Sequence, residues 1–395
     1  MKKFIPLCVP NFEGNERKYS DDAIAQGWVS TGGAYIAKLE KQMSEFLYVK
    51  DVAACQSGTA ALHLSLVECG VQPGDMVIVP TLTFIAAVNP VMYQFAEPVF
   101  MDCDDSLCMD PIKLEEFCNL ECHFDGKKLV HNNTGKHVKA IIVVHVFGNI
   151  ADMEKIMNIA KKYNLKVIED ATEALGSKFI SGKYAGKYAG TIGDFGAYSY
   201  NGNKIITTGG GGAITSKNID EVKHIRYLST QCKDDPHYYI HNEIGYNYRM
   251  TNVQAAIGVA QMEELPEFIR RKQNNYELYK SEFKNFKYGQ LMDFREGTSS
   301  NKWFYSLKID RSLIKVSMRE IITALEDLGI GTRPIWGLIH EQLPYKDNIA
   351  YKIEKAKYYS ECILNFPSST NLTYDDIKYV SEKIKNVLEG FADEK

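Results

Sequence analysis

The chain contains no apolar segment that approaches the ~20 residues needed to cross a lipid bilayer. Its formal net charge of -4 gives no general electrostatic attraction to nucleic acid or to anionic membranes. Residues 1–10 include two lysines and a few apolar residues, but Pro6 and Pro10 interrupt them, so they lack the pattern of a signal peptide. These features predict a globular protein without nucleic-acid or membrane partners.

Two glycine-rich phosphate-binding motifs are also missing. The Walker pattern G-x-x-x-x-G-K-[ST] does not occur, and no G-x-G-x-x-G follows an expected strand. The missing dinucleotide motif argues against a nicotinamide-dependent oxidoreductase. The nine cysteines are scattered and odd in number, which indicates reduced, mostly buried thiols in a cytoplasmic protein.

One group of cysteines and histidines could suggest a metal site. Cys118 and Cys122 are four residues apart on an expected helix, and His131 and His137 follow in the polar stretch 125–139. Structural zinc sites usually combine two closely spaced ligand pairs. We therefore interpret this region as a surface insertion between a helix and the next strand, and we expect no metal.

The length of 395 residues is enough for two structural units, and near-continuous apolar strand patterns alternate with helical patterns in the first of them. Runs of valine and isoleucine separated by helices predict a mostly parallel sheet covered on both faces. We expect strands at 76–80, 98–102, 138–144, 165–170, 195–200 and 212–215, with helices at 58–69, 111–118 and 152–163 between them.

The pattern changes near Thr251. A long helical stretch, 253–283, is followed by an alternating segment at 303–309 and another helix at 318–328. We predict a large α/β domain over residues 1–250 and a smaller α+β domain over residues 251–395. Ligands of open α/β sheets bind at the carboxyl ends of the strands, so the residues that follow the strands are the candidates for function.

Lys204 is the most informative of these residues. It lies between a short apolar segment and the four glycines 209–212, with the hydroxyl of Ser199 five residues upstream. Glycine adopts positive φ without steric cost, so the chain can turn sharply after a lysine that reaches a bound ligand. A lysine beside a turn is also commonly a solvated surface residue.

Three other strand ends carry side chains that complement this lysine. Ser57 and Gly58 open an apolar helix whose start can bind phosphate, although Ser57 can also serve only as a helix cap. Asp170 ends an apolar strand and needs either a positive partner or a capping role to offset burial. Phe84 follows another strand and can stack on a flat ring or belong to the core.

A phosphate-binding helix start, an acid, an aromatic ring and a lysine are together the parts that hold pyridoxal 5′-phosphate. The lysine amine forms a Schiff base with the aldehyde of the cofactor, and the acid keeps the ring nitrogen protonated. These residues therefore predict a cofactor-dependent enzyme.

The order and spacing of the same residues resemble those of the DegT/DnrJ/EryC1/StrS family of nucleotide-sugar aminotransferases, over nearly the full chain. The resemblance implies a fold-type-I architecture like that of aspartate aminotransferase, with a mostly parallel seven-stranded sheet, and a homodimer with shared active sites. The matching segments are 28–33, 57–62, 169–176, 199–204 and 245–252.

The resemblance implies a role in cofactor binding for eight residues. Lys204 binds the cofactor and moves the proton of the reaction, Asp170 pairs with the ring nitrogen, and Phe84 stacks on the ring. Glu173 falls near the ring hydroxyl. The residues that would hold the phosphate are Gly58, Thr59 and Ser199, together with Asn247 of the neighbouring subunit.

Three further residues fall where the family contacts its substrate, namely Arg249, Trp336 and His340. Arg249 could instead form a structural ion pair, and His340 could be an ordinary surface side chain. Two departures from the family pattern are Gly210, where many relatives have glutamate, and Thr172, where alanine is usual. Neither residue carries the proposed chemistry.

The family resemblance also implies a reaction, in which an amino group moves from L-glutamate to the C4 ketone of a nucleotide-linked 4-keto-6-deoxy sugar for glycan biosynthesis. The segments ending in Lys204 and Arg249 look most similar to the branch that uses UDP-2-acetamido-2,6-dideoxy-hexos-4-ulose. GDP-perosamine synthases and dTDP-sugar aminotransferases are alternatives, as is a non-catalytic regulatory or binding protein of the same fold. The dehydratase branch replaces the lysine with histidine, so Lys204 favours transamination.

Overall fold

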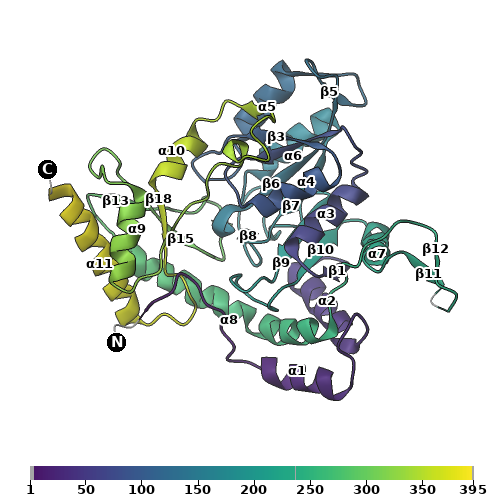
Figure 1. Cartoon of the computed structure of the whole chain (residues 1–395), viewed down its shortest axis with the longest axis horizontal. Coiled ribbons are helices and arrows are strands. Elements are labelled where there is room, and N and C mark those ends of the chain that lie inside the picture. Colours follow the sequence, from purple (N-terminus) through teal and green to yellow (C-terminus); the bar gives the residue numbers. More distant parts are fainter. Residues whose placement is uncertain (1–3, 236, 394–395) are drawn as a thin grey trace.

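The computed structural model describes residues 4–235 and 237–393, which form a large α/β part and a smaller part that packs beside it (Figure 1). A ten-stranded sheet is the centre of the large part. Its path is β1 (Val52–Cys55), β10 (Gly212–Ser216), β9 (Phe195–Ser199), β7 (Lys166–Asp170), β6 (His137–Val144), β2 (Met76–Pro80), β3 (Glu97–Met101) and β17 (Ala350–Tyr351).

The first seven of these strands correspond to the mostly parallel seven-stranded sheet that the family resemblance implies. Neighbours from β9 to β3 run parallel, and only β10 is antiparallel to both strands beside it. Every residue of β1, β2 and β10 is buried. Because successive side chains point to opposite faces, this burial shows that both faces of the sheet are covered.

Helices α3 (Gly58–Glu68) and α6 (Met153–Tyr163) pack against the sheet, α3 on β9 and β10 and α6 on β7. Burial of Met153, Ile156, Ala160 and Tyr163 along α6 follows the helical period, and Asp152 caps its start. The other helices of this part are α1 (Glu16–Ala25), α2 (Ala34–Leu47), α4 (Asn89–Tyr93), α5 (Pro111–Leu120), α7 (Ile219–Leu228) and α10 (Lys355–Cys362).

The expected insertion at 118–136 is a short hairpin attached to the sheet. Helix α5 ends at Leu120, and β4 (Cys122–Phe124) pairs with β5 (Leu129–His131), which in turn pairs with the start of β6. Cys122 therefore begins a strand, and our expectation that it shares a helix with Cys118 is wrong. Cys122 pairs with His131 in this hairpin, and β5 pairs in turn with the start of β6, so strand pairing takes the place of the expected helix.

Helix α8 (Asn252–Glu282) joins the two parts of the molecule. Thr251 and Gln254 form a reciprocal capping box at its start. Its first half packs into the core of the large part, whereas Tyr276 and Tyr279 pack into a second hydrophobic core. Figure 1 shows this helix running along the bottom of the molecule from one part to the other.

The second core lies between a four-stranded antiparallel sheet, the second half of α8 and two further helices. The sheet has the order β13 (Gly289–Leu291), β15 (Tyr305–Ile309), β18 (Ile363–Phe366) and β16 (Arg333–Pro334), and the helices are α9 (Met318–Asp327) and α11 (Tyr374–Asp393). Ile5 pairs with Ile330 and belongs to this core, while Ile335, Leu338 and Tyr351 belong to the core of the large part. The chain thus crosses between the parts several times, and the domain division at residue 250 stays a prediction.

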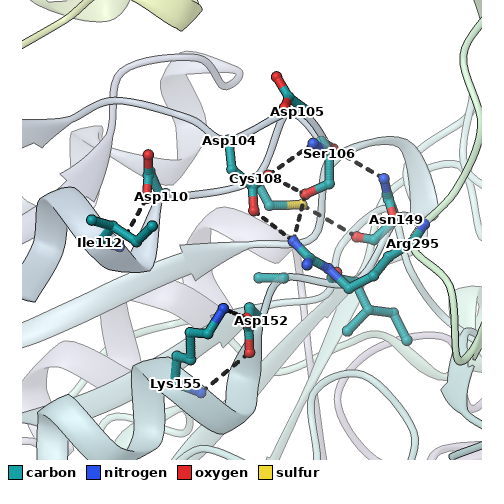
Figure 2. Close-up of polar contacts among 12 residues, drawn as sticks. Asp104, Asp105, Ser106, Cys108, Asp110, Ile112, Asn149, Asp152, Lys155 and Arg295 are labelled. Atoms are coloured by element: carbon teal, nitrogen blue, oxygen red, sulfur yellow. Dashed lines mark hydrogen bonds and ion pairs between the residues drawn. The ribbon is translucent and has the colours of Figure 1, made fainter.

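A polar cluster connects the two parts beside the sheet. Arg295 donates hydrogen bonds to Asp104 Oδ2 at 2.6 Å, to Ser106 Oγ at 2.8 Å and to the carbonyl oxygen of Ile150 at 2.8 Å (Figure 2). Asn149 accepts from the backbone N–H of Arg295 and donates to the carbonyl of Ser106. These bonds hold the segment that precedes the short strands β14 (Thr298–Ser299) and β8 (Lys178–Phe179) against the large part.

Two further features concern the outer surface of the molecule, namely a projecting hairpin and the apolar character of the helices. The hairpin of β11 (Lys233–Asp235) and β12 (Ile240–His241) projects from the large part, at the right of Figure 1. Among the described residues, no helix is long and apolar enough to cross a membrane.

Candidate active site

A cavity of about 750 Å³ opens where strand ends of the large sheet meet segments of the smaller part. Its walls include the start of α3, the ends of β7 and β9, and the segment around Trp303. Eight of the residues expected at the site line this cavity: Gly58, Thr59, Phe84, Asp170, Glu173, Ser199, Lys204 and Trp336.

The start of α3 forms one wall of the cavity and can hold an anion. Ser57 Oγ accepts a hydrogen bond from the Ala60 N–H at 3.0 Å, so its side chain is a helix cap. A Cβ on Gly58 would lie 2.9 Å from both Ser199 Cβ and Thr172 Cγ2. Glycine therefore lets β9 approach the helix closely, and the helix N-terminus offers N–H groups to a phosphate-sized ligand.

Asp170 lies at the end of β7 and is almost completely buried. One carboxylate oxygen accepts the Thr172 N–H at 3.1 Å, and burial raises the pKa of this carboxyl above its ordinary value. No cation forms an ion pair with it among the described residues. A buried acid that faces a cavity without a cationic partner suits a ligand with a protonated ring nitrogen.

The residue before Asp170 anchors the strand behind the site. Glu169 accepts the backbone N–H groups of Gly190, Ile192 and Gly193, and it lies 2.9 Å from His145 Nε2. His145 Nδ1 accepts the Ala151 N–H at 3.2 Å, so Nε2 carries the proton and donates it to Glu169. This buried network holds the strand end that presents Asp170.

Lys204 extends into the cavity from a turn that follows β9. Its Nζ is 3.6 Å from Glu173 Oε1 and 4.2 Å from the ring centre of Trp303. Glu173 Oε2 accepts the Phe147 N–H at 2.8 Å, and burial raises the pKa of Glu173 to about 7. The Trp303 indole N–H donates to the carbonyl of Asn203 at 2.7 Å, which fastens the turn beside the lysine.

Aromatic rings also line the cavity. Phe84 is 56% exposed at the cavity, so it is not a core residue. Phe147 lies 4.7 Å from Trp336 and 5.6 Å from Phe304, measured between ring centres, and Phe304 stacks on Trp303. The amine, buried acid, anion-binding helix start and exposed ring thus surround one cavity, and they fit pyridoxal 5′-phosphate.

Three of the expected site residues lie outside this cavity in their own chain. Asn247 is exposed and pairs with Thr230. Arg249 forms an ion pair with Glu40 and donates a hydrogen bond to the carbonyl of Ala54 at 3.0 Å. This ion pair is the structural role that the sequence analysis gave as the alternative to substrate binding. The roles of Asn247 and Arg249 in binding stay predictions.

His340 is the third, and its Nδ1 lies 2.6 Å from Thr81 Oγ1. Burial lowers the pKa of His340, which favours the neutral imidazole near neutral pH. The neighbouring segment that carries Trp336 does reach the cavity.

Several cavity residues were not expected from the sequence, among them Trp303 and Arg333. Trp303 begins an alternating strand pattern and reads as an ordinary core residue. Arg333 lies three positions before Trp336, so a search for cations near the expected substrate residues would have found it.

Comparisons with known proteins agree with this geometry. The model of the DegT/DnrJ/EryC1/StrS aminotransferase family matches residues 10–385. The GDP-perosamine synthase of Caulobacter vibrioides is 36% identical over 388 residues, covering 97% of this chain and 98% of that protein. The UDP-4-amino-4,6-dideoxy-N-acetyl-beta-L-altrosamine transaminase of Campylobacter jejuni (strain 81-176) is 28% identical, covering 91% and 92% of the two chains.

A solved structure gives the same result for the fold. The crystal structure of a DegT DnrJ EryC1 StrS aminotransferase from Brucella abortus has a TM-score of 0.83 and is 26% identical, covering 96% of this chain and 95% of that chain. The chain therefore belongs to the DegT/DnrJ/EryC1/StrS aminotransferase family, whose members depend on pyridoxal 5′-phosphate.

Proposed function

We propose that this protein moves an amino group from L-glutamate to the C4 ketone of a nucleotide-linked 4-keto-6-deoxy sugar for glycan biosynthesis. The observation that carries the proposal is the convergence of Lys204, Asp170 and the start of α3 on one cavity. The same cavity is also lined by Trp336 and has a volume of about 750 Å³, which leaves room for a substrate. UDP-2-acetamido-2,6-dideoxy-hexos-4-ulose is our first candidate.

Each residue has a definite part in this proposal. Pyridoxal 5′-phosphate, when bound, supplies an electron sink for the bond changes at the amine-bearing carbon. Gly58, Thr59 and Ser199 hold the phosphate, Asp170 holds the positive charge of the ring nitrogen, and Phe84 covers the ring. Lys204 carries the proton to and from the reacting carbon of the substrate.

Glu173 and Trp303 keep the amine of Lys204 in place. The carboxyl of Glu173 lies 3.6 Å from Nζ, and the indole ring lies below it at 4.2 Å. Only 13% of the lysine side chain is exposed, so bulk water has little access to the amine. Holding the amine in this way keeps it within reach of the cofactor and the substrate carbon.

A homodimer completes the site in this proposal. Trp28 is 59% exposed and Ile244 is 90% exposed, so both apolar side chains are available for contact with a second copy. Asn247 is exposed close to Ile244 in sequence and can reach the phosphate site of the partner.

Mixed dimers test this arrangement. Lys204→Ala and Asn247→Asp should each inactivate both sites of a homodimer, whereas their mixed dimer keeps one intact site. Statistical mixing then restores about a quarter of the wild-type activity, because half of the dimers are mixed. If each chain supplied its own asparagine, mixing would restore nothing.

A substrate screen tests the reaction itself. The purified holoenzyme is incubated with L-glutamate and with UDP-, GDP- or dTDP-linked 4-keto-6-deoxy sugars, and the product is identified by mass and NMR. A GDP-linked sugar is the second candidate, which the 36% identity with the GDP-perosamine synthase favours. Absence of a change in absorbance on adding L-glutamate would instead indicate the non-catalytic alternative.

We place the reaction in the cytoplasm. All nine cysteines are free in the structure, and most are buried, which agrees with a reducing compartment.

A further inference from the structure

Arg333 is a cation at the cavity that has no part in the roles described above. It lies on β16 and pairs through its backbone with Asn365 on β18, and both residues line the cavity. Its side chain is exposed, and Nη1 donates to the carbonyl of Thr332, the preceding residue, at 2.7 Å.

The charges around the cavity leave this guanidinium available. Among the described lining residues, the cations are Lys204 and Arg333, and the acids are Asp170 and Glu173. Lys204 lies beside Glu173, whereas no described carboxylate comes within 4.0 Å of Arg333. In contrast, Arg249 is paired with a carboxylate in the structure. An exposed guanidinium without a carboxylate partner is suited to a ligand that brings its own negative charge.

A flat aromatic ring lies on the same segment. Trp336 follows Arg333 by three residues and also lines the cavity, where its ring contacts Phe147 at 4.7 Å between ring centres. Pro334 directly after Arg333 restricts the backbone between them. The segment therefore presents a planar fork of hydrogen-bond donors and an aromatic surface, the two groups that bind a nucleoside diphosphate.

A nucleotide sugar whose reacting carbon lies at the buried Lys204 would direct its diphosphate toward the exposed side of the cavity, where Arg333 lies. In a hexose ring C1 and C4 are opposite each other, so a diphosphate on C1 points away from the carbon that reacts at Lys204. Lys204 is largely buried, whereas Arg333 is exposed. L-Glutamate is shorter, because its α-carboxylate is attached directly to the reacting carbon and its γ-carboxylate follows after two methylene groups, whereas the diphosphate follows the whole hexose ring.

We propose that Arg333 binds the diphosphate of the nucleotide-sugar substrate and that the enzyme depends on it for recognition of the nucleotide carrier. This inference rests on the proposed function. It separates two anionic substrates that enter the same cavity, because the nucleotide sugar contacts Arg333 and L-glutamate does not need it.

The test compares Arg333→Gln with the wild-type holoenzyme, using UDP, GDP and dTDP as probes in titration calorimetry. The control is Arg319→Gln, which removes an equal charge from an exposed position on α9 outside the cavity. The dissociation constant of the tightest-binding nucleotide should rise at least tenfold in Arg333→Gln and stay within twofold in Arg319→Gln. Arg333→Lys should fall between them, because lysine keeps the charge and loses the bidentate geometry.

L-Glutamate provides the second arm of the experiment. The glutamate concentration that gives half of the absorbance change of the bound cofactor should stay within twofold in Arg333→Gln. A tenfold rise in that concentration with unchanged nucleotide binding would overturn the proposal and identify Arg333 as a carboxylate site.

Two other outcomes would also overturn it, and they have different meanings. Nucleotide binding that is equally tight in Arg333→Gln and wild type removes the role of Arg333 but leaves the proposed function intact. If the wild-type holoenzyme responds to L-glutamate but binds none of the three nucleotides, the proposed substrate class fails together with the inference. Circular dichroism of each variant verifies that the fold is unchanged.

Discussion

Replacing Glu173 with glutamine should stabilise the cofactor-free protein at alkaline pH and leave its stability unchanged at acid pH. Glu173 is buried beside Lys204, and its pKa rises from 4.5 to about 7 because burial disfavours the charged carboxylate. The folded protein therefore keeps a proton that the unfolded chain releases above pH 4.5. The contribution of this group to the free energy of unfolding is greatest below pH 4.5 and falls as the pH rises to about 7.

The size of the effect follows from the difference between the two pKa values. At 1.36 kcal/mol per pH unit, a rise from 4.5 to about 7 corresponds to about 3 kcal/mol. Glutamine does not titrate, so Glu173→Gln should gain up to that amount over the wild type at pH 8 and almost none at pH 4. Urea unfolding of both proteins across this range measures the difference.

A matched control is Glu389→Gln, which changes an exposed glutamate on α11 in the same way. Its free energy of unfolding should stay close to the wild-type value at every pH. If Glu173→Gln is no more stable than the wild type at pH 8, burial does not destabilise the ionised carboxylate of Glu173. That outcome would mean that Lys204 compensates the buried carboxylate fully.

Two other substitutions test how the site is built. Gly58→Ala should weaken pyridoxal 5′-phosphate binding at least tenfold in a fluorescence titration. The added Cβ would lie 2.9 Å from Ser199 and Thr172 and would push the start of α3 away from the phosphate. Unchanged affinity would show that the helix start does not bind the cofactor. Glu40→Gln should lower the free energy of unfolding, measured in urea, by about 3–5 kcal/mol, because it leaves the largely buried Arg249 guanidinium without its carboxylate. An unchanged midpoint of urea unfolding would contradict a structural role for this ion pair.

The main elements of the fold could be predicted because their signals are local. The valine- and isoleucine-rich runs at 76–80 and 138–144 are strands of the parallel sheet, and the helical period of 153–163 is that of α6. Strand β1 has only four residues, and β17 has two, so neither carries a pattern that distinguishes it from a loop. Pairing with distant strands creates both of them.

The difference between local sequence signals and contacts between distant segments also explains what could be predicted about the site. Lys204 and Asp170 follow strands of one parallel sheet, so their side chains were expected at the same edge, and the structure places both at one cavity. Trp303 reaches Lys204 only because the chain returns from the smaller part. The partner of Arg249, Glu40, is 209 positions away in the sequence, and no local pattern announces such a pair.

Trapping the bond between protein and cofactor tests whether Lys204 holds pyridoxal 5′-phosphate. Sodium borohydride reduces an imine to a stable amine, so digestion and mass spectrometry of the reduced holoenzyme identify the lysine that holds pyridoxal 5′-phosphate. We predict one modified residue, Lys204, and no adduct in Lys204→Ala. Recovery of the adduct on another lysine, with Lys204 unmodified, would contradict it.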